Sequence, residues 1–173
     1  MRGIVVMNKK YPAYVLLILN LILQIASCFW YRELPGFVWV LASAIVILIP
    51  LLFGLRMGLL GLLPVAASEL VWFHKLGNVG PLLNLVAFAM AVILMAVAHQ
   101  RLTKLPRRNR AVLSGVLFIT VFAGRELLYQ GLRVLVLQKS VNWDTFFAQV
   151  FSPVILVVLI MLVVFVDRLG RES

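Results

Sequence analysis

The sequence predicts an all-α integral membrane protein, a bundle of about six transmembrane helices, and three observations support this fold class. The 173-residue chain is 64% hydrophobic and 13% charged, with a mean hydropathy of +1.08, whereas soluble domains are about 45–50% apolar and about 25% charged. Its apolar residues form long continuous runs, not the alternating pattern of a membrane β-barrel. It carries 16 Lys and Arg against 6 Asp and Glu. A soluble globule, a disordered tail, a coiled coil and a disulfide scaffold are excluded.

Six apolar runs follow one another in a single transmembrane domain covering residues 1–173, because about 20 residues are needed to cross the hydrocarbon core. The expected spans are approximately 11–31, 36–54, 56–74, 79–99, 111–137 and 145–167. Basic residues precede the first run as in a signal peptide, but its length and the lack of a small-residue cleavage site favour a retained span. The second and third runs are too long to be one crossing, so a tight turn is expected at 54–56.

The basic residues indicate an orientation with both termini in the cytoplasm, since cytoplasmic loops collect Lys and Arg. In this orientation three basic residues lie in external loops, two lie within the fifth span, and the cytoplasmic eleven are Arg2, Lys9, Lys10, Arg56, Arg101, Lys104, Arg107, Arg108, Arg110, Arg168 and Arg171. The tryptophans agree with it, because an aromatic belt at the external interface would hold Trp30, Trp39, Trp72 and Trp143.

The longest predicted loop, about 100–110, reads QRLTKLPRRNR and contains five basic residues and no acidic one. These are Arg101, Lys104, Arg107, Arg108 and Arg110. The loop serves as a topology signal in one interpretation. In the other it also contacts anionic lipid headgroups, at roughly 1 kcal/mol per basic residue. No nucleic-acid partner is expected, because the segment has no aromatic ring on which a base could stack.

Ionisable residues within the predicted spans form the main candidate site, because each costs about 2.5–3.5 kcal/mol to insert. Glu69 lies in the outer half of the third span, and the fifth span carries Arg125, Glu126, Gln130 and Arg133. We hypothesise a Glu69–Arg125 ion pair between the two spans, with a Glu126–Arg133 pair as the alternative. Three roles remain open for this polar network: locking the bundle, binding or transporting a ligand, and contacting a partner protein.

Two amides in the first span, Asn20 and Gln24, lie one helical turn apart. Amides of this kind form hydrogen bonds between membrane helices at roughly 1 kcal/mol, so they are interpreted as helix-packing residues. Pro64 is expected to kink the third span shortly before Glu69.

No catalytic residue, cofactor or metal site is expected. Cys28 is the only cysteine, and His74 and His99 lie at opposite ends of different spans. The sequence contains no HExxH, Walker or GxSxG motif.

The stretch 58–80 reads GLLGLLPVAASELVWFHKLGNVG, in which Gly61, Glu69 and the pair Leu76–Gly77 are evenly spaced. Further along come Trp143, Phe146 and Phe147, then Ser152–Pro153 and a long apolar segment. This order resembles the bacterial rod-shape-determining family MreD, short six-span proteins in which a glycine-rich half-helix leads to an acidic residue and a Leu-Gly turn. The family more often has Asp at the position of Glu69, and another glycine where Pro64–Val65 stands.

The resemblance implies a non-enzymatic scaffold of the cell-elongation and peptidoglycan-synthesis machinery in the bacterial cytoplasmic membrane. Its partners would be MreC and, through MreC, RodA with its penicillin-binding transpeptidase. MreD also resembles in fold the S components of energy-coupling-factor vitamin transporters, so an S component is the alternative. Its vitamin pocket would be lined by Glu69, Trp72, Arg125, Glu126 and Tyr129. The first span lacks the alanine pattern with which S components dock, which favours the scaffold, and the first span and region 36–61 are the expected docking faces.

Overall fold

The computed structural model describes residues 10–30 and 35–169, without the side chains of residues 10, 107, 108 and 167–169. Arg2, Lys9, Arg32 and Arg171, and the side chains of Lys10, Arg107, Arg108 and Arg168, therefore lie outside the described part. Within that part the chain is helical and contains no strand. The helices are α1 (Lys10–Phe29), α2 (Gly36–Phe53), α3 (Leu55–Leu76), α4 (Gly80–Leu102), α5 (Arg107–Leu137), α6 (Trp143–Val150) and α7 (Pro153–Leu169).

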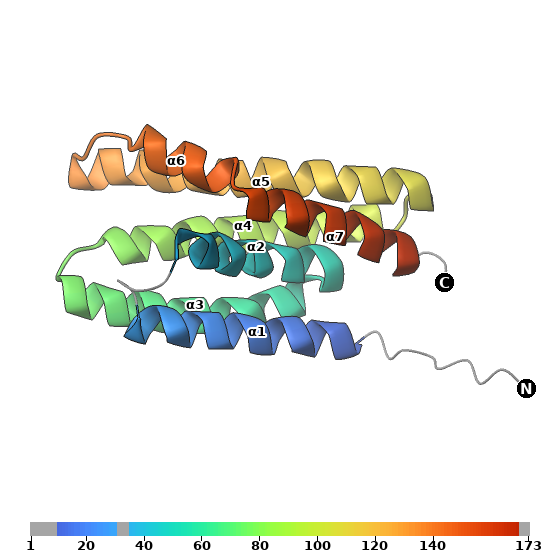
Figure 1. Cartoon of the computed structure of the whole chain (residues 1–173), viewed down its shortest axis with the longest axis horizontal. Coiled ribbons are helices and arrows are strands. Elements are labelled where there is room, and N and C mark those ends of the chain that lie inside the picture. The colour runs from blue at the N-terminus through green and yellow to red at the C-terminus, as the bar shows by residue number, and fades with distance from the viewer. Residues whose placement is uncertain (1–9, 31–34, 170–173) are drawn as a thin grey trace, which may run out of the picture.

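The helices form a bundle in which α2 and α4 occupy the middle (Figure 1). Helix α4 packs against α2, α3 and α5, while α1 packs on α2 and α3, and α7 packs on α2 and α5. Six segments are long and apolar enough to cross a bilayer, the sixth being α6 and α7 taken together as Trp143–Val166. The predicted class, an all-helical protein with six potential membrane spans, is confirmed at this level.

The polypeptide turns sharply between α2 and α3 at Gly54, whose φ of 82° favours a residue without a side chain. Its backbone N–H donates to Pro50 O at 2.9 Å, which closes α2. His99 of α4 contributes a second cap, since its Nδ1 lies 2.7 Å from Leu51 O. A carbonyl oxygen only accepts, so Nδ1 carries the proton of this bond. The turn therefore lies where the sequence predicts it, and it is fixed from outside by α4.

The last predicted span, 145–167, is instead two helices separated at Phe151 and Ser152. Pro153 has no backbone N–H and cannot continue the helix-bond ladder. Ser152 Oγ accepts from Val154 N at 3.3 Å and begins α7. Helix α6 begins with its own cap, because Asn142 Oδ1 accepts from Thr145 N at 2.9 Å.

The basic segment 100–110 is also shorter as a loop than predicted. Arg101 lies in the last turn of α4 and Arg107–Arg110 lie in the first turn of α5, so only residues 103–106 connect the helices. Pro106 precedes α5 with an extended ψ of 146°. Arg110 reaches back, and its Nη2 donates to Leu105 O at 3.1 Å and Thr103 O at 3.4 Å. This arginine thereby binds carbonyls that follow the C-terminus of α4.

The main apolar core lies between α2, α4, α5 and α7. Its buried members include Phe118 and Phe122 of α5, with ring centroids 6.1 Å apart, and Met95 of α4. A second cluster joins α2, α3 and α4 around Val46, Val65, Phe88 and Val92. Helix α3 packs on α1 and on α4. Its polar side chains therefore reach α1 on one side and α4 on the other.

Candidate functional site

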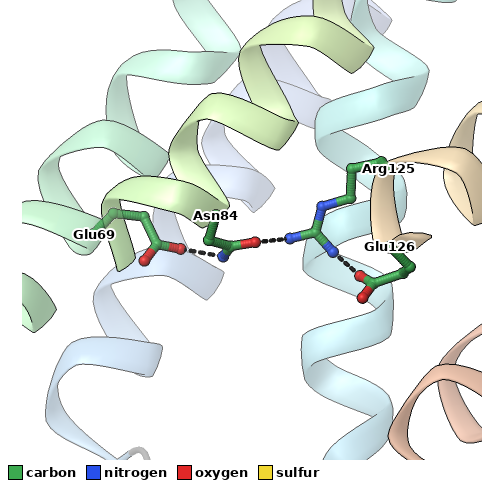
Figure 2. A network of polar contacts seen from close by, with 4 residues as sticks. All are labelled: Glu69, Asn84, Arg125 and Glu126. Carbon is green, nitrogen blue, oxygen red and sulfur yellow. Dashed lines mark hydrogen bonds and ion pairs between the residues drawn. The ribbon is translucent and has the colours of Figure 1, made fainter. Parts of the chain in front are cut away.

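Polar side chains from four helices meet at the end of the bundle formed by the α3–α4 and α5–α6 connections. We call this group the charged network, and it consists of Glu69 (α3), Asn84 (α4), Arg125 and Glu126 (α5) and Gln149 (α6). Figure 2 shows the first four as a continuous row of hydrogen bonds and ion pairs. All five residues lie within segments apolar enough to cross a membrane.

Asn84 stands at the centre of the charged network. Its Nδ2 donates to Glu69 Oε1 at 2.5 Å, and its Oδ1 accepts from Arg125 Nη2 (Figure 2). The expected direct ion pair between Glu69 and Arg125 is therefore wrong, although both residues lie at the same depth. An asparagine has both a donor and an acceptor, so a single amide satisfies the carboxylate on one side and the guanidinium on the other.

Arg125 forms its ion pair with the adjacent residue, Glu126. The two are buried, with 6% and 1% of their surface exposed, so each depends on the other for charge compensation. The Arg125 guanidinium also lies over the Phe88 ring, 3.9 Å from its centroid. Gln149 completes the carboxylate shell: with its amide nitrogen facing Glu126, it donates to Oε1 at 2.7 Å and Oε2 at 3.0 Å.

The alternative pairing of Glu126 with Arg133 is also wrong, because Arg125 pairs with Glu126. Arg133 Nη1 instead donates to Gln130 Oε1 at 3.2 Å, and the same oxygen lies 3.5 Å from Asn142 N. Gln130 thus connects α5 to the residue that caps α6. The Tyr129 ring lies between the arginines, with its centroid 5.6 Å from the Arg133 guanidinium and 5.9 Å from that of Arg125.

The charged network borders a cavity of about 840 Å³ between α2, α3, α4, α5 and α6. Sites for small molecules usually have about 300–1,000 Å³ and a few polar groups that fix the ligand. The polar lining includes Glu69, Asn84, Arg125 and Glu126, and aromatic rings come from Trp39, Trp72 and Tyr129. Arg125 Nε is buried and has no hydrogen-bond partner among the described residues. The site therefore presents residues of both signs of charge to a small polar group.

A second group, which we call the neutral network, joins α1 to the other side of α3. Asn20 Nδ2 donates to Gly61 O at 2.7 Å, and Gln24 Nε2 lies 3.5 Å from Asn20 Oδ1. Ser68 Oγ donates to Gln24 Oε1 at 2.8 Å, and Ser27 Oγ lies 2.7 Å from Gln24 O. All the side chains of this network are buried. The two predicted amides therefore contact α3 and not a cavity.

Gly61 and the Leu76–Gly77 pair have structural positions that their residue types explain. Gly61 is buried where a side chain would approach Ile49 Cδ1 to 3.1 Å. Pro64 within α3 has no N–H for the carbonyl of Leu60, and Asn20 binds the next carbonyl, that of Gly61. Gly77 ends α3 in the left-handed region at φ 62°, and its N–H donates to Phe73 O. It is a helix C-terminal glycine of the usual kind.

This chain matches no protein-family model, no curated protein and no solved structure. Fold and site therefore rest on the chain's own residues. Among the described residues, no group of three or more His, Cys, Asp or Glu lies together as a metal site would require.

Sequence reasoning missed two members of the charged network, Asn84 and Gln149. Each is an amide within an apolar stretch, PLLNLVAF for Asn84 and FFAQVF for Gln149. The same signal had identified Asn20 and Gln24, so it was present. What was lacking was the rotation of each helix about its axis, which decides whether an amide faces another helix or the lipid.

Proposed function

We propose that this chain is a non-enzymatic membrane scaffold of the bacterial cell-elongation machinery, of the MreD type. It would bind MreC and, through MreC, RodA and its penicillin-binding transpeptidase. The observation that carries this proposal is the internal pairing of the charged network. Glu69, Asn84, Arg125, Glu126 and Gln149 are joined to one another across α3, α4, α5 and α6, which favours a bundle with fixed helix positions.

The outer face of α1 is the docking surface that we favour for MreC. Helix α1 lies at the edge of the bundle and packs mainly on α2 and α3 (Figure 1). Its outward side chains include Ile18, Ile22 and Ile25, which are exposed. In a membrane such a face meets either lipid or a span of another protein. The neutral network holds α1 in register on α3, so that this face is presented in one orientation.

Cross-linking from matched positions tests the scaffold proposal. In a Cys28→Ser background, Ile22→Cys on α1 and Ile160→Cys on α7 are comparable, with 56% and 55% of the native side chains exposed. We expect the full-length chain to co-purify with MreC. A thiol cross-linker should join Ile22→Cys, and not Ile160→Cys, to a cysteine placed in the MreC span. Failure to co-purify contradicts the scaffold, whereas equal cross-linking from both positions contradicts only the assignment to α1.

The cavity favours a second candidate, a solute-binding S component of an energy-coupling-factor transporter. The cavity is lined by the five residues expected for a vitamin pocket, namely Glu69, Trp72, Arg125, Glu126 and Tyr129. Equilibrium binding of a panel of vitamins to the purified chain distinguishes the two candidates. Tight binding without a partner protein, lost in Asn84→Ala, would replace the scaffold with the transporter. No binding across the panel, together with co-purification with MreC, supports the scaffold.

A further inference from the structure

A second cavity, of about 600 Å³, lies at the opposite end of the bundle from the charged network. It is formed where α1 begins, α2 turns into α3, and α4 leads into α5 (Figure 1). Basic or potentially basic side chains line it: Arg56, His99 and Arg110. None of the described residues that line it is acidic. This cavity therefore differs from the charged network, in which the arginine is paired with a carboxylate.

The C-termini of α2 and α4 also reach this cavity. Their partial negative charge is offset, because side chains donate hydrogen bonds to carbonyl oxygens there. His99 Nδ1 donates to Leu51 O of α2, and Arg110 Nη2 donates to Thr103 O and Leu105 O after α4. The N-terminus of α3 faces the same region with Arg56 and Met57, and its first turn has no acidic residue and no side-chain cap. A helix N-terminus carries partial positive charge, so it adds to the field of the arginines.

One donor beside this cavity is unsatisfied. Arg110 Nε is buried and has no hydrogen-bond partner among the described residues, although Nη2 of the same side chain is used twice. Ser114, which is buried, and Tyr14 add hydroxyl groups to the lining. Guanidinium and hydroxyl donors around a common space are the groups that bind phosphate oxygens.

Most of the remaining lining is apolar and includes Leu51, Leu52, Met57, Leu102 and Val166. A free phosphate has no apolar part to pack against this lining, whereas a phosphate attached to an acyl chain does. We infer that this cavity binds the phosphate group of one anionic lipid, with Arg56 and Arg110 contacting the phosphate and the apolar wall receiving the adjoining acyl chain. This site is distinct from general attraction of the basic segment 100–110 to an anionic surface, and it does not depend on the proposed function.

Binding of dioctanoyl phosphatidic acid to the full-length protein in neutral detergent, counted by native mass spectrometry, tests the inference. We expect one lipid per chain, with about fivefold weaker binding in Arg56→Gln, which removes one exposed charge. Arg101→Gln is the matched control, since Arg101 is exposed at the same end but does not line the cavity. It should weaken binding by less than about twofold.

A second variant separates the cavity from surface charge. Met57→Trp keeps every charge and fills the space with a larger side chain, so it should abolish the single bound lipid. Equal weakening in Arg56→Gln and Arg101→Gln, or full binding in Met57→Trp, would overturn the site. Inorganic phosphate and dioctanoylglycerol serve as separate competitors. Displacement by phosphate at the same concentration as the lipid would show a free-phosphate site instead, and displacement by dioctanoylglycerol would show an apolar groove without phosphate recognition.

Discussion

Helix α3 takes part in two polar networks of different chemistry, one on each side. The neutral network on the α1 side uses amides, hydroxyls and a backbone carbonyl, and its side chains bond to one another and to α3. The charged network on the α4 side contains two carboxylates and a guanidinium, borders a cavity and leaves Arg125 Nε without a described partner.

The two networks differ in what they cost in a membrane. Hydrogen bonds between membrane helices contribute about 0.6 kcal/mol each on average. A neutral network therefore stabilises the contact between two helices without the cost of inserting a charge. Ionisable groups cost about 2.5–3.5 kcal/mol each to insert, so the charged network depends on its internal pairing to offset this cost. The comparison therefore separates a neutral network that packs α1 on α3 from a charged network whose insertion cost is offset by pairing across α3, α4, α5 and α6.

Removal of one charge from the buried pair should give the largest effect. In Glu126→Ala the Arg125 guanidinium loses its ion pair while it remains buried, and removal of one member of such a pair costs about 3–5 kcal/mol. We expect this loss in the free energy of unfolding, measured by SDS titration of the purified protein in mixed micelles.

The double variant Arg125→Met/Glu126→Leu is the control for this prediction. It removes both charges and keeps the volume of the side chains, so most of the stability should return. A double variant that is as unstable as Glu126→Ala would mean that the effect comes from packing and not from an uncompensated charge.

Asn84→Ala should have the next largest effect, because this amide is hydrogen-bonded to both Glu69 and Arg125. Two hydrogen bonds to charged groups are lost, but Asn84 lines the cavity and water entering there replaces them in part, so we expect a loss of about 1.5–3 kcal/mol. The readout is a double-mutant cycle on Glu69→Gln and Arg125→Met, measured with and without Asn84. We expect coupling between the two residues in the native background and little in Asn84→Ala. Unchanged coupling would show that the two charges interact directly.

The sequence predicts the helices better than it predicts their contacts. The thickness of a bilayer fixes the length of an apolar run, so α1–α5 lie close to the expected spans. The break before Pro153 was missed because residues 145–167 are mostly apolar and long enough for one crossing, although the Ser152–Pro153 pair was visible. Similarly, the depth of Glu69 and Arg125 along their spans correctly predicted that they lie near one another. Depth along a span does not predict how α4 is rotated about its axis, and this rotation places Asn84 between the two residues.

On the other side of α3, Asn20→Leu should cost less than either change in the charged network. The substitution keeps the side-chain volume and removes the bond to Gly61 O, so we expect a loss of about 1 kcal/mol in the same unfolding assay. Leu21→Ala on the exposed face of α1 is the control and should remain within about 0.5 kcal/mol of the native protein. A loss in Asn20→Leu as large as that in Glu126→Ala would remove the distinction between the two networks.

The smallest effect is expected for Gly61→Ala, because the acceptor that Gly61 offers to Asn20 is a backbone carbonyl and survives any substitution. The new Cβ would lie 3.1 Å from Ile49 Cδ1, the far end of a flexible side chain, and alanine favours a helix over glycine by about 1 kcal/mol. The two terms offset, so the free energy of unfolding should change by less than about 1 kcal/mol. Gly58→Ala is the contrasting variant, since its Cβ would lie 2.6 Å from Pro50 Cβ, where the rigid ring cannot move aside. If Gly61→Ala proved as damaging as Gly58→Ala, the contact between α1 and α3 would be limited by close packing and not by the hydrogen bonds of the neutral network.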